Sequence, residues 1–211
     1  MPVGVKICGL STPETLDAAV ARGARHVGLM FYAPSPRHLE FGQASALAAR
    51  VPAHVGRVGV FVDPDDALLD AAIAAAGLDT LQLHHVAPAR AAALRTRTGR
   101  QVWATVAVRA RADLAEAERF RGAADLILYD AKTPEGTLPG GMGVRFDWTL
   151  LSGHRSPLPW ALSGGLDAGN LATAVAQSGA TLLDVSSGVE TAPGVKDVDK
   201  IAAFLNAAQQ L

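Results

Sequence analysis

The sequence has a single cysteine, few aromatic residues and no excess of charge of either sign. Cys8 is the one cysteine in 211 residues, which excludes an intramolecular disulfide framework. Nineteen basic and twenty acidic residues give a formal net charge of -1. The chain therefore has no excess of positive charge with which to bind nucleic acid or an anionic membrane surface. No apolar run reaches the roughly 18 residues of a membrane span, and no signal-peptide pattern is present. We therefore expect a small-molecule partner and a reducing, cytoplasmic setting.

Hydrophobic residues, by contrast, are abundant. They make up 49% of the chain while aromatic residues contribute only 5%, so Ala, Leu and Val must fill the core. No linker, low-complexity tract or shift in composition divides the sequence. We predict one domain over residues 1–211 and, since no feature fixes an oligomeric state, we expect a monomer.

Short β-branched or apolar runs alternate with longer Ala-rich segments along the whole chain. Ser11-Thr12-Pro13-Glu14 opens one Ala-rich segment with an N-cap and a first-turn proline, and Gly77 and Gly179 close others. We therefore expect a helix after every strand. The eight predicted strands are Val3–Ile7, Val27–Phe31, Val58–Val62, Thr80–Leu83, Gln101–Val106, Leu126–Tyr129, Trp160–Leu162 and Leu182–Val185.

This order predicts an α/β fold, a parallel sheet closed into a (β/α)8 TIM barrel. The chief alternative is a doubly wound open sheet, but Cys8-Gly9-Leu10-Ser11 lacks the glycine pattern of a dinucleotide site. The longest segment without helix or strand periodicity runs from about Ala131 to Arg145. Loops after barrel strands gather on the catalytic face, so we expect this segment to act as a lid.

Cys8 follows the first predicted strand, where barrels place catalytic groups. Strand alternation puts Cys8 on the same side as Lys6. A nearby ammonium favours the thiolate, so we expect a lowered thiol pKa and a working base near neutral pH. A lone cysteine is also typical of a small buried apolar residue, and that alternative stays open here.

Two aspartates occupy matching places near the ends of predicted strands. Asp130 follows the sixth strand and Asp184 lies in the eighth. Two carboxylates on one rim can supply an acid and an electrostatic role if their environments differ. The alternative for Asp130 is a loop-capping aspartate.

Two adjacent loops predict a phosphate site. Gly164-Gly165 follows the seventh strand and Ser186-Ser187-Gly188 the eighth, where barrels commonly bind phosphate through backbone N–H groups. Arg37 lies in a proline-flanked loop and could pair bidentately with a substrate carboxylate. Ordinary turn glycines and a solvated surface arginine are the alternatives.

The adjacent histidines do not indicate a metal. His84 and His85 point to opposite faces of a strand end and cannot both reach one ion, so we predict no metal site. By parity with Gln82, His84 is a candidate for the pocket lining, and a polar residue at the barrel mouth is the alternative.

Taken together, these residues resemble the phosphoribosylanthranilate isomerase family over nearly the whole chain. The motifs match in order and spacing. They are Lys6-Ile7-Cys8-Gly9-Leu10, Phe31-Tyr32-Ala33-Pro34-Ser35-Pro36-Arg37, Gln82-Leu83-His84, Gly140-Gly141-Met142-Gly143 with Phe146-Asp147-Trp148, Leu162-Ser163-Gly164-Gly165-Leu166, and Asp184-Val185-Ser186-Ser187-Gly188-Val189-Glu190 with Pro193-Gly194-Val195-Lys196-Asp197.

The resemblance implies a cofactor-free Amadori rearrangement of phosphoribosylanthranilate in tryptophan biosynthesis. It implies Cys8 as general base, Asp130 as general acid and Arg37 as ligand of the anthranilate carboxylate. Asp184 and His84 would help to bind the substrate, with phosphate at the two loops named above. The sequence departs from the family at Met142, where Thr or Ser is usual, and at His85, where Gly is usual. These departures bear on loop contacts and rate.

Two other functions stay open. One is a different phosphosugar isomerase or epimerase barrel, although the six histidines do not obviously supply the His and Asp ligands of a metal-dependent epimerase. The other is a barrel that binds phosphate without catalysis, which the presence of both Cys8 and Asp130 disfavours.

Overall fold

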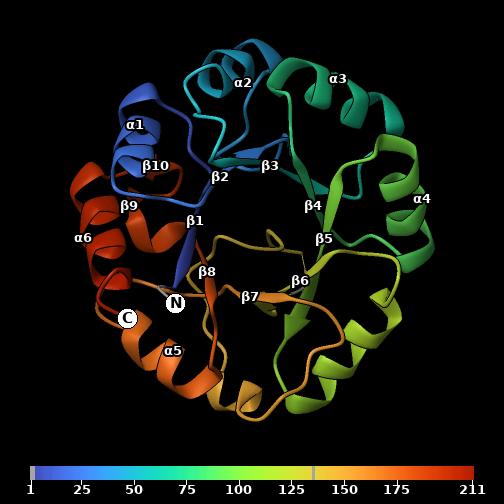
Figure 1. Ribbon diagram of the computed structural model, residues 1–211, viewed down its shortest axis with the longest axis vertical. Helices are drawn as coiled ribbons and strands as arrows, with labels where there is room; N and C mark the ends of the chain where they lie inside the picture. Colours follow the sequence, from blue (N-terminus) through green and yellow to red (C-terminus); the bar gives the residue numbers. More distant parts are fainter. Residues whose placement is uncertain (1–2, 135) are drawn as a thin grey trace.

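The computed structural model describes residues 3–134 and 136–211. Eight parallel strands form a closed barrel in the order of the sequence, and β8 pairs with β1 (Figure 1). This confirms the predicted (β/α)8 barrel, and the open-sheet alternative is wrong. The strands are β1 Gly4–Cys8, β2 His26–Met30, β3 Gly56–Val62, β4 Thr80–His84, β5 Gln101–Val108, β6 Leu126–Ala131, β7 Trp160–Leu162 and β8 Leu182–Val185.

Helices form an outer ring around these strands (Figure 1). The α-helices are α1 Pro13–Ala21, α2 Phe41–Ala48, α3 Asp66–Ala76, α4 Pro88–Thr98, α5 Leu171–Ser178 and α6 Val198–Ala208. After β8 the chain forms a short 3-10 helix, η3 (Ser187–Val189), and then an antiparallel hairpin of β9 (Glu190–Ala192) and β10 (Val195–Lys196). The ring closes where α1 packs against α6.

The expectation of a regular helix after every strand needs correction at two strands. In the described residues, β5 is followed by the 3-10 helix η1 (Arg111–Phe120) and β6 by the single 3-10 turn η2 (Trp148–Leu151). The segment between β6 and η2 is rich in glycine and proline, both of which disfavour the α-helix interior. The long loop predicted there is confirmed, except that Glu135 lies outside the described residues.

The predicted helix ends are confirmed. Thr12 caps α1, its hydroxyl accepting from the Thr15 amide, and Pro13 is the first helical residue. Gly77 ends α3 with φ +54° and Gly179 ends α5 with φ +74°. Both angles lie in the left-handed region that glycine tolerates best.

The core has two parts because strand side chains alternate between the helices and the barrel interior. Ile7 and its equivalents on other strands pack outward against the helices. A smaller interior cluster consists of Cys8, Val58, Val60, Trp103, Leu128, Ala161 and Leu182. Lys6 also lies in the interior and is fully buried, which requires a charged partner.

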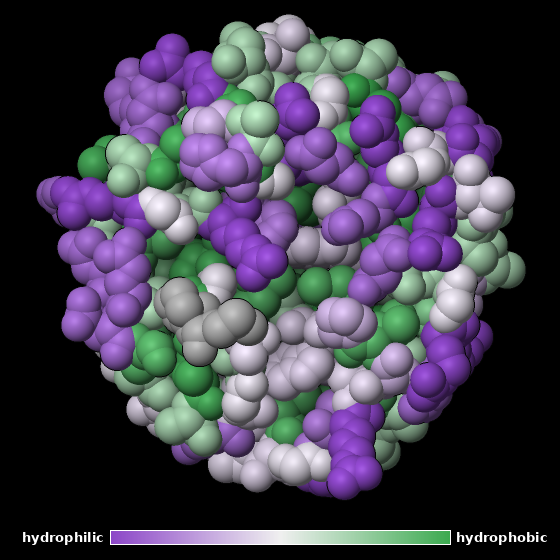
Figure 2. Space-filling model, viewed as in Figure 1, coloured by the Kyte–Doolittle hydropathy of each residue, from purple (hydrophilic) through white to green (hydrophobic). Residues whose placement is uncertain are grey.

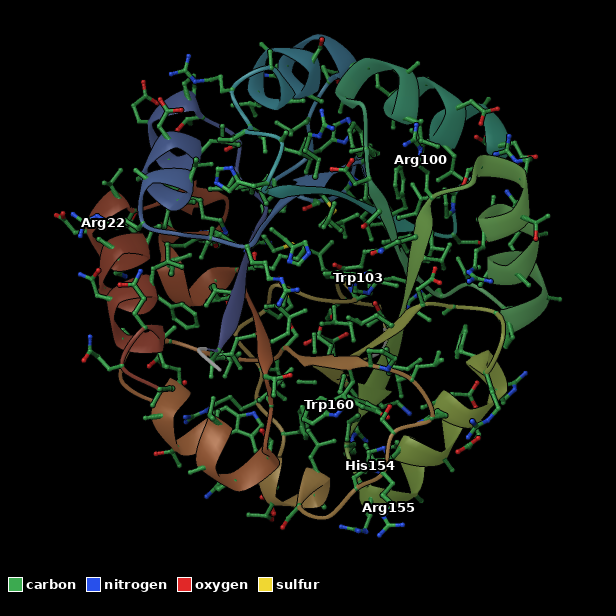
Figure 3. The ribbon with its side chains drawn as sticks, viewed as in Figure 1. Arg22, Arg100, Trp103, His154, Arg155 and Trp160 are labelled. Carbon is green, nitrogen blue, oxygen red and sulfur yellow. The ribbon has the colours of Figure 1, made fainter. Side chains whose placement is uncertain are left out.

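The first residues of the strands form the amino-terminal face. Trp103 and Trp160, labelled in Figure 3, lie inside the ring of helices, and Trp103 packs edge-on against His26 at 5.0 Å between ring centroids.

In Figure 2, hydrophilic residues gather over the helices at the left and right edges, whereas paler and hydrophobic residues gather below the centre. No helix in the described part of the chain is both long and apolar enough to cross a membrane.

Candidate active site

Most of the predicted site residues lie together at the carboxyl ends of the strands. One pocket is lined by Cys8, Arg37, His84, Asp130, Asp184 and Ser186. A second, adjoining pocket shares Asp130, Asp184 and Ser186 with the first and adds Gly164, Gly165 and Ser187. Gly188 does not line either pocket. The arrangement brings the candidate base and acid beside the candidate phosphate loops.

Lys6 connects the first and last strands inside the barrel. The β1–β8 register pairs Lys6 with Asp184, and the Lys6 Nζ donates to Asp184 Oδ1 at 2.9 Å. Burial lowers the pKa of Lys6, but the charges of Asp184 and Cys8 outweigh it, so the net pKa is raised. Lys6 is therefore a fixed cation beneath the pocket.

The expectation of a lowered thiol pKa at Cys8 is wrong. Burial raises the pKa of the thiol, and the positive charge of Lys6 offsets that rise only in part. The Asp184 carboxylate, which shares Lys6, raises the pKa of Cys8 further. Strand alternation predicts the position of the Lys6 cation correctly, whereas the pairing of Lys6 with Asp184 joins residues 178 apart and has no local sequence signal.

Asp130 has the electrostatics of an acid that works near neutral pH. Burial and the negative charge of Asp184 raise its pKa to about 7, and the hydrogen bond from the Ala131 amide to Oδ1, 2.8 Å, offsets only part of this rise. Protonated and ionised forms are therefore both populated near pH 7. A group of this kind can both give and regain a proton during turnover.

The two histidines differ as predicted. His84 is buried and lines the pocket, and burial together with the charge of Lys6 lowers its pKa to about 3, so the ring is neutral. Its Nε2 lies 3.1 Å from the side-chain amide nitrogen, Nε2, of Gln82. His85 is exposed and has φ +57°, a left-handed conformation that suits the glycine usual there. Among the described residues, no three His, Cys, Asp or Glu side chains cluster as metal ligands would.

Glycine is required in the two candidate phosphate loops because backbones approach closely. Gly165 has φ +64°, and a Cβ added there would lie 3.0 Å from the Gly143 carbonyl oxygen. At Gly188 an added Cβ would lie 1.8 Å from the Leu166 carbonyl oxygen, so any side chain would push the two loops apart. The structure thus gives Gly188 a spacing role between the loops that its sequence pattern does not reveal.

Residues 138–141 of the loop after β6 lie over the pocket. Leu138, Pro139, Gly140 and Gly141 line it, and a Cβ added to Gly140 would come within 3.0 Å of Asp130 Oδ2. The Gly141 carbonyl accepts a hydrogen bond of 3.0 Å from Arg37 Nη2. This placement is consistent with a lid, and its movement stays a prediction.

Arg37 differs in two ways from the sequence-based alternatives. It is not a solvated surface arginine, because only 3% of it is exposed. Its bidentate edge is already occupied, since Nε and Nη2 each donate to a carboxylate oxygen of Glu190 at 2.7 Å. The predicted bidentate pairing with a substrate carboxylate needs correction at this edge, and among the described residues Nη1 is the guanidinium nitrogen without a protein acceptor.

Glu190 and Lys196 are polar residues at the site to which the sequence pattern assigned no role. Lys196 Nζ donates to Glu190 Oε1 at 2.5 Å and to the Ser186 carbonyl at 3.0 Å. The available signal was the Pro193-Gly194 pair, which predicts a tight turn and so places the flanking residues opposite each other.

Comparison with known proteins gives a consistent result. Residues 5–207 match the family model of N-(5'phosphoribosyl)anthranilate (PRA) isomerase. The chain is 53% identical over 213 residues to an N-(5'-phosphoribosyl)anthranilate isomerase of Zymomonas mobilis subsp. pomaceae, and the match covers 100% of both chains.

Solved structures agree in fold. The chain resembles a structure of monomers made from the dimeric phosphoribosylanthranilate isomerase of Thermotoga maritima, with TM-score 0.84 and 33% identity over 99% of this chain and 100% of that one. A second structure, of a phosphoribosyl anthranilate isomerase in complex with reduced 1-(o-carboxyphenylamino)-1-deoxyribulose 5-phosphate, gives TM-score 0.84 and 32% identity with the same coverage.

Proposed function

Because the chain belongs to the N-(5'-phosphoribosyl)anthranilate isomerase family, we propose that it rearranges N-(5-phosphoribosyl)anthranilate to 1-(2-carboxyphenylamino)-1-deoxyribulose 5-phosphate in tryptophan biosynthesis. The observation that carries the chemistry is the buried Asp130, whose pKa is raised to about 7, in one pocket with Cys8. The reaction requires an acid and a base in one site. The matches lend no support to another phosphosugar isomerase or epimerase, or to a non-catalytic barrel.

Asp130 acts first in the proposed sequence, as general acid. Its proton goes to the ring oxygen of the ribose, the ring C–O bond breaks, and the amine nitrogen supplies the electron pair that forms a Schiff base. The Cys8 thiolate then removes the proton from the second sugar carbon, which gives an enolamine. Tautomerisation to the ketone completes the rearrangement. Proton transfers by Asp130 and Cys8 and the electron pair of the substrate's own nitrogen account for every bond made and broken, so the proposal includes no metal or cofactor.

The phosphate and the anthranilate carboxylate lie at opposite ends of the substrate, away from the reacting carbons, and each end needs its own binding residues. We assign the phosphate to the loops at Gly164-Gly165 and Ser186-Ser187, and the anthranilate carboxylate to Arg37. His84 is neutral and lines the same pocket, which suits a hydrogen bond to a sugar hydroxyl. Asp184, held by Lys6, would orient the sugar. Binding energy from such remote contacts can lower the barrier to the chemical step.

The required protonation state is a minor one in the free protein. Cys8 has a raised pKa and is mainly a thiol at neutral pH, while Asp130 titrates near 7. The working form therefore has the proton of Cys8 transferred to Asp130. Lys6 favours this form, because its charge lies beside the thiolate that results.

The assembly of the protein stays a prediction. We propose that one domain over residues 1–211 carries the whole site and acts as a monomer. The Thermotoga maritima relative is described as dimeric, so the state of this chain needs its own measurement. Sedimentation of the purified protein at two concentrations would decide the question.

The activity can be tested by the loss of anthranilate-type fluorescence in the presence of a chelator. Substrate is generated in situ from anthranilate and phosphoribosyl pyrophosphate, and then wild type or Cys8→Ala is added. We expect rapid loss with wild type and near-complete failure of Cys8→Ala, with unchanged circular dichroism as the control for folding. A folded wild type without turnover would overturn the proposed function, and an active Cys8→Ala would remove Cys8 as base.

A further inference from the structure

The β9–β10 hairpin carries two oppositely charged side chains, Glu190 and Lys196, and Glu190 forms the hydrogen bonds to Arg37. The strand register sets Lys196 opposite Glu190, and both side chains are buried. Lys196 Nζ donates to Glu190 Oε1 at 2.5 Å, to the Ser186 carbonyl at 3.0 Å and lies 3.2 Å from the Ser186 Oγ. Its donors are thus directed to protein atoms, and it does not line the pockets that hold Cys8 and Asp130.

Glu190 in turn fixes the plane of Arg37. Two hydrogen bonds of 2.7 Å hold the Nε and Nη2 edge, and the Gly141 carbonyl takes a further bond from Nη2 at 3.0 Å. Among the contacts of the described residues, Nη1 is the guanidinium nitrogen without a protein acceptor. A guanidinium held in this way presents one defined donor position instead of a mobile charge.

The charges of the three residues explain why a lysine is needed. Arg37 and Glu190 alone form a neutral pair, which would attract a substrate carboxylate only weakly. With Lys196 the buried group carries a net positive charge. The net pKa of Lys196 is lowered from its ordinary value, because burial outweighs the opposing charge of Glu190. The Lys196 Nζ lies within 3.2 Å of three oxygens, Glu190 Oε1, the Ser186 carbonyl and the Ser186 Oγ, and this matches the three N–H donors of an ammonium group.

We propose that Lys196 is a positioning residue that gives the site its preference for substrates with a carboxylate at the Arg37 end. Glu190 orients the guanidinium, and Lys196 supplies the positive charge that Glu190 would otherwise cancel. This inference rests on the proposed function, since the carboxylate in question is that of the anthranilate group.

A purely structural role is the competing explanation. The hairpin turn at Gly194 packs on the loop that precedes Arg37, where a Cβ added to Gly194 would lie 2.6 Å from the Pro36 carbonyl oxygen. The ion pairs could simply hold this turn on that loop. A structural role would affect all ligands alike, whereas a charge role affects only those with a carboxylate.

Binding of two product analogues separates these explanations. One is reduced 1-(o-carboxyphenylamino)-1-deoxyribulose 5-phosphate, and the other is the same compound without the carboxyl group. Titration calorimetry gives Kd for both with wild type, Lys196→Met and Lys200→Met. Lys200 is the matched control, because it is exposed and its Nζ donates to the Glu190 backbone carbonyl, not to the carboxylate.

We expect wild type and Lys200→Met to share the same preference for the carboxylated ligand. In Lys196→Met that preference should fall about tenfold, within the usual range for coupling between neighbouring groups, with little change for the ligand that lacks the carboxylate. Equal weakening of both ligands, or an unchanged preference, would overturn the proposal. If Lys196→Met does not fold, Lys196→Gln keeps a hydrogen-bond donor without the charge and is judged by the same ratio.

Failure of the proposed function would look different. In that case wild type itself would show no preference for the carboxylated ligand and no turnover of phosphoribosylanthranilate. Wild-type turnover combined with an unchanged preference in Lys196→Met would overturn the role of Lys196 alone.

Discussion

Asp130 and Asp184 are two aspartates with nearly the same sequence signal and different electrostatic environments. Both lie at the carboxyl ends of strands, line the same pocket, and are 7% and 5% exposed. Asp184 lies opposite Lys6 in the β1–β8 register and forms an ion pair with it. Asp130 lies opposite Ala107 in the β5–β6 register, and its pKa is raised to about 7.

The comparison shows that the residue on the neighbouring strand determines the electrostatic environment, and so the chemical role, of a buried carboxylate. One aspartate forms an ion pair with a lysine, and the negative charge of that aspartate helps to raise the pKa of the other. Two carboxylates in one pocket are thereby divided between an electrostatic role and an acid role.

The largest effect should come from removing the acid. Asp130→Asn should lower kcat about 10³-fold, because the amide cannot protonate the ring oxygen, whereas Asp184→Asn should cost about tenfold through substrate orientation. Steady-state kinetics on both variants gives the comparison. Equal losses would mean that the two aspartates do not have separate roles.

Breaking the ion pair should destabilise the barrel. Lys6→Met leaves the Asp184 carboxylate buried without its partner, which we expect to lower the free energy of unfolding by about 3–5 kcal/mol. The double variant with Asp184→Asn should recover much of that loss, since no buried charge remains. Urea unfolding measures both. A single variant as stable as wild type would show that the ion pair contributes no net stability.

The acid should weaken the fold when it is ionised. The folded-state pKa of Asp130, about 7, lies above the usual 3.8, so its favourable contribution is complete below about pH 4 and is lost as the pH rises through 7. Relative to wild type, Asp130→Asn should therefore gain about 2 kcal/mol between pH 5 and pH 8. Urea unfolding at both pH values tests this, and a difference independent of pH would contradict the raised pKa.

The smallest effect should be a shift in the pH profile. Because Cys8 titrates above Asp130, the pair holds one proton between the two pKa values, and kcat/KM should rise with pH through about 7. Asp184→Asn removes a negative charge that raises the pKa of Asp130, so this limb should move about one pH unit lower. Asp70→Asn, at an exposed position, is the control and should leave the limb in place. A limb that stays near 7 in Asp184→Asn would show that Asp184 does not act on Asp130.

The barrel and most site positions could be predicted because they depend on local pattern. Buried strands leave apolar runs of strand length, and a parallel barrel gathers the following residues on one face. Cys8, Asp130 and Asp184 were located in this way. The 3-10 helices after β5 and β6 were missed, since η1 lies in a segment with ordinary helical composition.

The parts that could not be predicted depend on contacts distant in the sequence. Glu190 is 153 residues from Arg37, so nothing local indicated that the bidentate edge was occupied. The direction of the Cys8 pKa shift depends on how burial compares with the charge of Lys6, and only the folded structure sets that balance.

The two strands without α-helices after them have a further consequence for local opening. A 3-10 helix has poorer hydrogen-bond geometry than an α-helix, and segments with fewer buried contacts open at a lower free-energy cost than the core. Amide hydrogen exchange should therefore begin in residues 136–152 and 111–120, while β1 and β8 stay protected. The 3-10 helix η1 packs against β5, which is hydrogen-bonded to the strand that carries Asp130, so we expect this opening to begin one strand away from the acid.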